Sequence, residues 1–208
     1  MPEVLARVER GECLPTDPWL DLVPSPSPDK AAVTAFPGHI VVAADVDRPW
    51  LDERLVDGDL AAPLSPRFLT ALEDRLGLVC GCIDAVVLAD PLPGPPPLDL
   101  TALDDSNHPR VVRARRFRSD VRVWTAGDSV LVIGRGLAGR WEAAIEVDGQ
   151  ARNAGLGRSL ARSARHLVPG NSPVWAQVAP GNAASLRAFL AAGYRPVGGE
   201  VLLTPHGD

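Results

Sequence analysis

Residues 141–160 read WEAAIEVDGQARNAGLGRSL and contain a strand, a connection and the start of a helix. The segment AAIEV is apolar enough for a buried strand, and Asp148 to Ala151 forms a turn-like connection. From Leu156 onward, apolar residues recur at helical spacing, while arginines occupy another side of the same helix. The apolar positions are Leu156, Leu160, Ala164 and Leu167, and the arginines are Arg158, Arg162 and Arg165.

The start of this helix has the properties of an anion site. The first amides of a helix have no internal acceptor, and the helix dipole adds partial positive charge there. Glycines at positions 155 and 157 would let a phosphate approach the backbone closely. The segment Arg152 to Gly157 therefore predicts a diphosphate site that needs neither lysine nor metal.

A second glycine pattern lies upstream, at Gly134 to Gly139, and matches the dinucleotide fingerprint G-x-G-x-x-G. That fingerprint requires a helix after the glycines and an acidic residue about 20 residues later. Here the next segment, RWEAAIEVD, favours another strand, and Asp148 follows too soon. We therefore interpret this pattern as a turn between two antiparallel strands, with Gly136 and Gly139 available for positive φ.

The surrounding segments extend the pattern in both directions. A basic helix is predicted at 108–118, followed by an antiparallel run of strands at 120–126, 129–136 and 140–148. After the helix at 155–168 come a strand at 173–179, a helix at 182–192 and a final strand at 194–205.

The N-terminal half is set off by two proline-rich segments, 23–30 and 90–97. We predict a partly irregular leader at 1–30, an α/β module at 31–97 that ends in a proline-rich linker, and a C-terminal domain at 98–208. Within the module, strands are expected at 39–45 and 82–90 and helices at 48–58 and 65–76, the latter with Ser65 as N-cap and Gly77 at its exit. An acidic cluster (Asp45, Asp47, Asp52 and Glu53) is interpreted as solvated surface and helix-start charge.

The composition narrows the function classes. The formal net charge of −5 argues against a nucleic-acid-binding protein. Three cysteines without a regular framework indicate a reducing compartment, and Cys80-Gly-Cys82 has no second ligand pair for zinc, so no metal site is predicted. No apolar run is long enough to span a membrane, and the charged N-terminus does not fit a signal peptide; we expect a cytoplasmic protein with no membrane partner.

The stretch VDGQARNAGLGRSL resembles the acyl-CoA-binding motif R/Q-x-x-G-x-G/A of the GNAT superfamily of N-acetyltransferases. The following segment strengthens the resemblance: a strand leads to Asn182, a helix carries Phe189 seven residues later, and Gly193-Tyr194 follows. The resemblance covers about 98–205. It implies an α/β (α+β) GNAT acyltransferase fold, with a mixed, mostly antiparallel sheet and two splayed parallel strands, plus an N-terminal α/β extension. The 31–97 module is either a degenerate repeat of a similar lobe or a family-specific one.

The family binds acetyl-CoA between the splayed strands, which here would be 141–147 and 173–179. The resemblance implies that the pantetheine arm lies along the strand backbone and the pyrophosphate on the helix-start amides, with further contacts from the next helix. The implied strand positions are Ala144, Ile145 and Val147. The implied loop and helix-start positions are Arg152, Asn153, Ala154, Gly155, Leu156, Gly157 and Arg158. The implied positions on the next helix are Asn182, which is equally suited to be an N-cap, Ser185 and Phe189.

The implied reaction is attack of a primary amine on the thioester, for which a base must remove a proton. Glu142 is the first candidate and Glu146 the second, and strand alternation places both on the same side. The family commonly protonates the thiolate with a tyrosine where this chain has Phe189. Phenylalanine cannot donate a proton, which leaves three alternatives. Water or Ser185 protonates the thiolate, the thiolate leaves unprotonated, or the domain has weak turnover. The expected function is acetyl transfer to an unidentified amine; the alternative is a catalytically weak acyl-CoA-binding regulatory or interaction module.

A dense set of arginines follows the proline-rich segment, at positions 110, 113, 115, 116 and 118. It is interpreted either as a solvated helix face or as a surface that recognises an acidic acceptor or a CoA phosphate. The neighbouring His108, Asp104 and Asp105 could bind a cationic amine. The family often forms homodimers, which is the assembly that the resemblance suggests.

Overall fold

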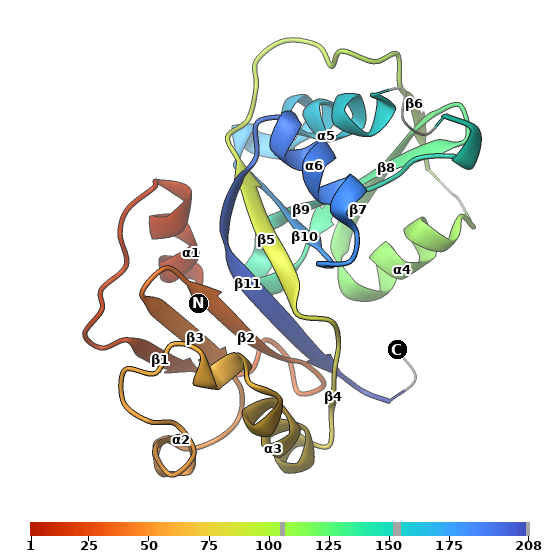
Figure 1. The fold of residues 1–208 in the computed structure, drawn as a ribbon. Coiled ribbons are helices and arrows are strands. Elements are labelled where there is room, and N and C mark those ends of the chain that lie inside the picture. Colours follow the sequence, from red (N-terminus) through yellow and green to blue (C-terminus); the bar gives the residue numbers. More distant parts are fainter. Residues whose placement is uncertain (105–106, 152–154, 207–208) are drawn as a thin grey trace. The chain divides into compact units, whose positions relative to one another are not determined.

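The computed structural model describes residues 1–104, 107–151 and 155–206. The chain divides into two compact units (Figure 1): unit 1 is Met1–Ala85 with Val197–Asp208, and unit 2 is Val86–Pro196. Two strands pass from one unit into the other, β5 (Asp84–Ala89) and β11 (Arg195–Thr204).

Unit 1 is built on a mixed sheet in the order β1-β3-β2-β11. Its strands are β1 (Leu20–Val23), β2 (Ala31–Phe36) and β3 (His39–Ala43), and the two-residue β4 (Val79–Cys80) also pairs with β11. β1 is parallel to β3, with Leu20 opposite Ile40, while β2 is antiparallel to both β3 and β11. The tight turn between β2 and β3 at Pro37-Gly38 explains why these two strands are neighbours.

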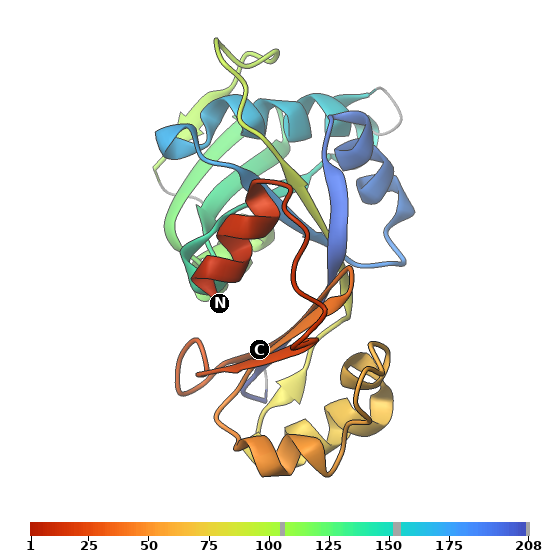
Figure 2. The same cartoon turned by 90° about the vertical axis from the view of Figure 1, so that its left-hand side faces the viewer.

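The helices of unit 1 are α1 (Pro2–Glu9), α2 (Arg48–Asp52), the 3-10 turn η1 (Ala62–Leu64) and α3 (Pro66–Leu76). Figure 2 shows α2 and α3 on one side of the β1–β3 strands. The Ser65 hydroxyl accepts a bond from the amide of Phe68, and Gly77 ends α3 in the left-handed conformation, as predicted. The apolar face of α3 buries Phe68, Leu69 and Leu72, which join the sheet side chains in one core.

Unit 2 carries a sheet in the order β6-β7-β8-β9-β10-β5. The pairs from β6 to β9 are antiparallel, whereas β10 is parallel to β9. The strands are β6 (Thr101–Leu103), β7 (Ser119–Ala126), β8 (Ser129–Arg135), β9 (Trp141–Glu146) and β10 (Val174–Val178). The helices are α4 (Pro109–Phe117), α5 (Leu156–Leu167) and α6 (Ala183–Ala191), with 3-10 turns η2 (Leu137–Gly139), η3 (Gly149–Ala151) and η4 (Pro169–Asn171).

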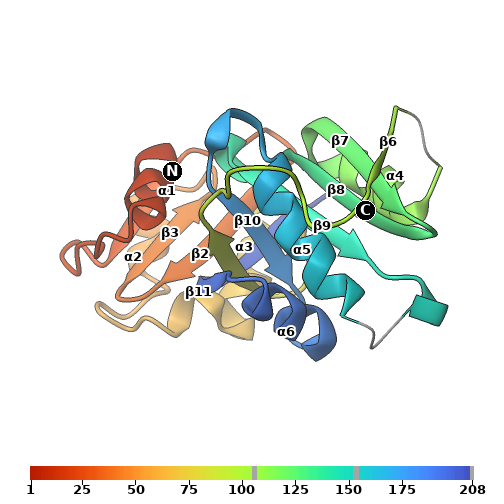
Figure 3. The ribbon, with the colours of Figure 1, turned by 90° about the horizontal axis from the view of Figure 1, so that it is seen from above.

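Helices cover both faces of the unit 2 sheet, and side chains of β8 alternate between them. Leu131 and Ile133 pack into the core under α5 and α6, whereas Val130 and Val132 pack into a smaller core with α4. Figure 3 looks onto the α5 side, where α5 and α6 lie next to each other. The fold is thus a mixed α/β fold with parallel and antiparallel strands, and the fold class expected from the sequence is confirmed.

The proline-rich segment 90–97 is attached to α5. The amide of Leu92 donates to the Arg165 carbonyl at 2.8 Å, and Arg165 Nε donates to the Asp90 carbonyl at 2.8 Å. The His166 ring contacts the Gly94 carbonyl at 3.1 Å. Proline cannot donate a backbone hydrogen bond, so this segment depends on such side-chain and isolated amide contacts rather than on a strand ladder.

Most elements expected from periodicity are present, with shifts at their ends. The helix expected at 48–58 is shorter and ends at Asp52. Several elements were not expected, among them α1 and β1, which lie inside the predicted partly irregular leader, β2 at the start of the α/β module, and the two-residue β4. The two compact units also divide the chain differently from the predicted boundaries, because β1 pairs with β3 and the end of β11 pairs with β2.

The cap of α3 offers a test of local stability. We expect Ser65→Ala to lower the free energy of unfolding by about 0.5–2 kcal/mol, because the Phe68 amide loses its acceptor. The hydroxyl also donates to the Ala62 carbonyl at 2.7 Å, and that bond is lost as well. Urea denaturation measures the change, with Thr70→Ala as the control, since Thr70 is exposed on the same helix. Equal stability of the two variants would contradict the cap assignment.

Candidate functional site

A cleft of about 580 Å³ lies in unit 2, within the usual size of small-molecule sites. It is formed by the end of β9, the first turns of α5 and α6, and one side chain of α4. The lining residues are Arg110, Ile145, Glu146, Val147, Gly155, Leu156, Gly157, Arg158, Asn182, Ala184, Ser185, Arg187 and Ala188. The sequence-predicted positions Ile145, Glu146, Val147, Gly155 to Arg158, Asn182 and Ser185 are therefore brought together.

The parallel pair of β9 and β10 explains why a cleft opens at this place. Their register joins Glu142 with Trp175, near the start of both strands. The opposite edge of β9 pairs with β8 along its length, from Trp141 to Glu146. Beyond Glu142, the edge of β9 that faces β10 therefore leads into the cleft at Ile145 and Glu146.

The two glycines at the start of α5 have different roles. Gly155 is the N-cap with φ of +80°, a conformation that a side chain would strain, and a glycine has no side chain with which to cap the helix. A Cβ at Gly157 would lie 3.4 Å from both Ala188 Cβ and Val147 Cγ2, so this glycine lets α5 approach α6 and β9. The first amides of α5 have no acceptor within the helix, and they lie at its positive end beside the cleft.

Some predicted positions fall elsewhere. Arg152, Asn153 and Ala154 lie outside the described residues. Ala144 is on β9 but does not line the cleft. Asn182 is the N-cap of α6, where its Oδ1 accepts from the Ser185 amide at 3.0 Å, and it lines the cleft as well.

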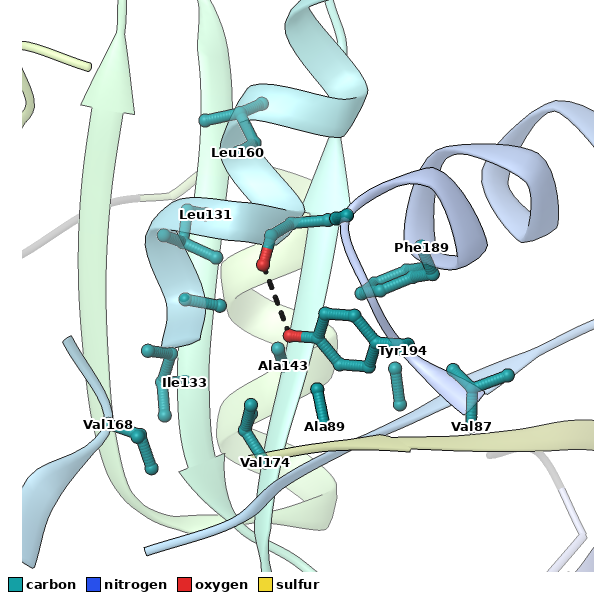
Figure 4. Packing of buried hydrophobic residues seen from close by; sticks show 14 of the residues in the cluster. Val87, Ala89, Leu131, Ile133, Ala143, Leu160, Val168, Val174, Phe189 and Tyr194 are labelled. Carbon is teal, nitrogen blue, oxygen red and sulfur yellow. Dashed lines mark hydrogen bonds between the residues drawn. The ribbon is translucent and has the colours of Figure 1, made fainter. Parts of the chain in front are cut away.

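Phe189 belongs to the core under α5 rather than to the cleft lining. Its ring packs edge-to-face on Tyr194, with ring centroids 4.9 Å apart (Figure 4). The Tyr194 hydroxyl donates to the Ala161 carbonyl at 3.2 Å. Burial raises the pKa of Tyr194, only partly offset by the positive charge of Arg165. Both rings are therefore structural: each is almost fully buried, and the tyrosine proton is engaged by α5.

The charges around the cleft are mostly positive. Arg110, Arg158 and Arg187 line it, together with one carboxylate, Glu146. Arg110 Nε donates to Glu146 Oε2 at 3.1 Å, and the two side chains are 36% and 44% exposed. A site with more arginine than carboxylate favours an anionic ligand, and a guanidinium is well suited to phosphate.

Glu142, the other predicted base, is buried and held by four donors. Arg118 Nε and Arg140 Nε donate to its carboxylate at 2.8 and 2.9 Å. Gln177 Nε2 and the Leu137 amide donate to the same carboxylate at 3.2 and 3.3 Å. Burial opposes ionisation, but the charges of Arg140 and Arg118 prevail and hold the pKa of Glu142 below its usual 4.5. With its oxygens so occupied, this carboxylate is better suited to hold the fold than to accept a substrate proton.

The two glutamates face the same helix, as strand alternation predicts. Glu146 pairs with Arg110 at the start of α4, and Glu142 pairs with Arg118, the residue that ends it. Four residues of strand span about 13 Å and eight residues of helix about 12 Å, so the two ion pairs fit a helix antiparallel to β9. The other arginines of the basic segment differ: Arg113 and Arg116 lie over the Phe117 ring, and Arg115 donates to the Asp104 carbonyl.

The glycine pattern at 134–139 forms a turn between antiparallel β8 and β9, as predicted. Only Gly139 has the positive φ, +78°, whereas Gly136 has φ of −104°. Gly136 is required for another reason: a Cβ there would lie 2.2 Å from Glu142 Cδ. Sequence reasoning therefore missed a small network around Glu142, made by Arg118, Arg140, Gln177 and Gly136. The available signal was the unusual density of arginine around a strand glutamate.

Two kinds of feature are absent from the described residues. No helix among them is long and apolar enough to cross a membrane. No group of three or more His, Cys, Asp or Glu among them is arranged to hold a metal ion.

Comparison with known proteins gives matches among solved structures. No family model matches the sequence, and no curated protein matches it. A GCN5-related N-acetyltransferase from Kribbella flavida matches with a TM-score of 0.41 and 17% identity, over 67% of this chain and 64% of that one. A GCN5-related N-acetyltransferase from Sphaerobacter thermophilus matches with a TM-score of 0.41 and 16% identity, over 67% of this chain and 56% of that one. Both neighbours are named as members of the family whose motifs this sequence resembles. This chain spans less than two thirds of the length of either protein.

The network around Glu142 predicts a pH-dependent loss of stability. Glu142→Gln should lower the free energy of unfolding at neutral pH by about 3–5 kcal/mol, because the buried guanidinium of Arg140 and the largely buried one of Arg118 lose their counter-charge. The folded-state pKa is lowered, so the carboxylate stabilises the fold above pH 4.5 and loses that effect as the pH falls through the folded-state value. The difference from the natural protein should therefore shrink below pH 4.5.

Chemical denaturation at several pH values measures this difference. The matched control is Glu146→Gln, whose half-exposed ion pair should contribute no more than about 1 kcal/mol. If both variants lose the same amount, or if the loss for Glu142→Gln does not depend on pH, then the buried ion pairs do not have the assigned role.

Proposed function

We propose that this chain is a GNAT-type N-acetyltransferase that transfers an acetyl group from acetyl-CoA to a primary amine. The observation that carries the proposal is the position of the cleft. It joins the start of α5, whose N-cap is a glycine, the edge of β9 beyond its pairing with β10, and the start of α6. A long ligand with an anionic part and an extended amide-rich arm suits this combination.

The proposed diphosphate seat is the first turn of α5. The amides of Leu156, Gly157 and Arg158 point out of the helix start, where the dipole favours negative charge. The side chains of Arg158 and Arg187 line the same cleft and add positive charge. We also assign Arg152, Asn153 and Ala154 to this seat, on the motif alone. The net positive lining supports a diphosphate here in a chain whose overall charge is −5.

The proposed place of the pantetheine arm is the edge of β9, next to Ala144, Ile145 and Val147. An extended arm with two amides can pair with a strand edge as an added strand does. Ile145 and Val147 line the cleft from the α5 side, while Glu146 lines it from the α4 side. A ligand seated at this edge would thus have its reactive end accessible to groups from both faces of the sheet.

Acetyl-CoA would supply an activated thioester whose carbonyl carbon the neutral amine attacks, with the thiolate as the leaving group. For the proton of the amine, we propose Glu146 as the base, directly or through water, because it is half-exposed and lines the cleft. Arg110 at 3.1 Å would hold this carboxylate in place. Glu142 is proposed as a positioning residue, because its buried carboxylate fixes the neighbouring parts of β9, β10 and α4.

No tyrosine among the described residues is placed to protonate the thiolate. Phe189 is in the core, and the Tyr194 proton is engaged by the Ala161 carbonyl. Ser185 lines the cleft and is the available hydroxyl, with water as the other donor. A CoA thiol is acidic enough to leave as the thiolate, so the reaction does not require a side-chain acid.

This same feature favours the second candidate function, an acyl-CoA-binding module with weak turnover. Both candidates predict acetyl-CoA binding in the cleft, and they differ in turnover with amines. A homodimer is the assembly that we propose by analogy with the family. The acceptor is specified here only by its amine group.

The diphosphate seat is tested by calorimetric titration with CoA. We expect Arg158→Ala to raise the Kd for CoA about tenfold, because a charge-assisted contact with phosphate is lost. Arg162→Ala is the matched control, since Arg162 is exposed on the same helix and does not line the cleft. Equal effects of the two substitutions on the Kd would exclude the Arg158 side chain from the diphosphate seat.

The proposed base is tested by the release of CoA thiol from acetyl-CoA across a panel of small amines, aminoglycosides and peptide N-termini. With any amine that is acetylated, Glu146→Gln should lower kcat/KM about 100-fold or more and leave the Kd for CoA nearly unchanged. The exposed Glu3→Gln is the control. Tight binding of acetyl-CoA with no thiol release from any amine would instead favour the binding module.

A further inference from the structure

A second concavity in unit 2, of about 600 Å³, shares no lining residue with the cleft. It is lined by Asp120, Val121, Arg122, Arg135, Trp141, Pro169, Gly170 and Ser172. Three adjacent strands and the segment after α5 contribute to it. We propose that this concavity, named here the arginine pocket, binds the carboxylate or phosphate group of a small molecule.

The strand registers place the cationic side chains of the arginine pocket on one face of the sheet. Arg135 on β8 is directly opposite Trp141 on β9, and Arg122 on β7 is opposite Ile133, two residues from Arg135. Ile133 and Trp141 belong to the core under α5, so all of these side chains share the α5 face. Because α5 ends at Leu167, this end of the face is left to the 169–172 segment.

The two guanidiniums lie over the same indole ring. The Cζ atoms of Arg135 and Arg122 are 4.2 and 5.9 Å from the centroid of the Trp141 ring. Trp141 is 5% exposed, so the ring is a fixed support and not the recognition surface. Cation–π contacts of this kind hold a guanidinium in place while its N–H groups stay available.

Arg135 is further fixed by two partners. Its Nε pairs with Asp120 Oδ2 at 3.3 Å, and its Nη1 donates to the Gly139 carbonyl at 2.7 Å. A guanidinium has five N–H groups, so Arg135 keeps donors beyond these two. The Arg122 guanidinium contacts the indole ring and has no ion-pair or hydrogen-bond partner among the residues described here. The arginine pocket thus contains two arginines against one aspartate, and that aspartate is engaged.

Backbone strain is concentrated around the same pocket. Within the described ranges, the non-glycine residues with positive φ are Asp120, Ala138 and Asn171. Asp120 lies at the register shift between β7 and β8. Ala138 lies in the β8–β9 turn, next to Gly139, whose carbonyl accepts from Arg135. Asn171 lies between the lining residues Gly170 and Ser172. Strained backbone persists where the surroundings impose it and is common at ligand sites. Here the strain at Asp120 places the carboxylate that orients Arg135.

The arginine pocket and the cleft are at opposite ends of α5. The cleft uses residues 155–158 at its start, and the arginine pocket uses residues that follow its end. Twelve helical residues span about 18 Å, so one small anion cannot occupy both. The carboxyl end of α5 contributes partial negative charge, and affinity in the arginine pocket must therefore come from the two guanidiniums.

The test is a titration of the whole chain, labelled with ¹⁵N, with inorganic phosphate and separately with succinate at constant ionic strength. The signals to follow are the Nε–H groups of Arg122 and Arg135 and the indole N–H of Trp141. We expect at least one of the two anions to shift these signals saturably, and Arg122→Gln to raise its Kd about tenfold. Saturation by phosphate alone or by succinate alone would identify which oxyanion the pocket accepts.

The matched control is Arg113→Gln, which removes another exposed guanidinium that lies over an aromatic ring, outside both pockets. Shifts that stay linear in anion concentration, or an equal effect of the two substitutions on the Kd, would overturn the proposal. The titration is repeated with saturating CoA, which should leave the phosphate Kd unchanged; loss of phosphate binding would mean that CoA itself occupies the pocket. Because the readout needs no acetyl transfer, it is independent of the proposed function.

Discussion

The ion pairs of the buried Glu142 carboxylate are the interactions on which the arrangement of unit 2 depends. Moving an ionised carboxylate out of water costs several kcal/mol, and the cost is offset only if opposite charges and donors surround it. Here the donors come from distant parts of the sequence: the end of α4, the β8–β9 turn and β10. Each of these elements has to be in place before the charge is compensated, so the network favours a single arrangement of unit 2.

The same network has a consequence for the cleft. The registered pair of the parallel strands, Glu142 with Trp175, is also where Arg140 lies over the Trp175 ring, 4.9 Å from its centroid. Pairing and charge therefore fix β9 to β10 at one point, and the edge of β9 is available beyond it. A carboxylate used in this way loses the freedom that a base needs, whereas Glu146, four residues further on, is fixed by one half-exposed arginine. On the same strand, Glu142 is therefore suited to a structural role and Glu146 to proton transfer.

Local sequence signals predicted much of this fold and some of the site. The Ser65 cap, the exit at Gly77 and the strand–glycine–helix order around Gly155 depend on residues close in sequence, and each is present in the structure. The strand β2 was missed although the Pro37-Gly38 turn follows it, because its short apolar segment has no alternating pattern and its second partner, β11, is distant in sequence. The role of Glu142 was missed for the same reason, since Arg118 and Gln177 lie 24 and 35 residues away.

The glycine patterns also show that a local sequence signal does not reveal contacts with residues distant in sequence. A motif specifies that positions 155 and 157 are glycine, but the structure distinguishes a required backbone conformation at Gly155 from a required close packing at Gly157. Gly136 matched a dinucleotide fingerprint, although its missing Cβ makes room for the Glu142 carboxylate. In all three cases a side chain is excluded, for reasons that depend on neighbours the pattern does not contain. Only one of these reasons concerns a helix start. A match to a glycine motif therefore supports a phosphate site only where a glycine is the N-cap of a helix and the helix start opens into a cleft. At α5 both conditions hold, and at Gly134 to Gly139 neither does.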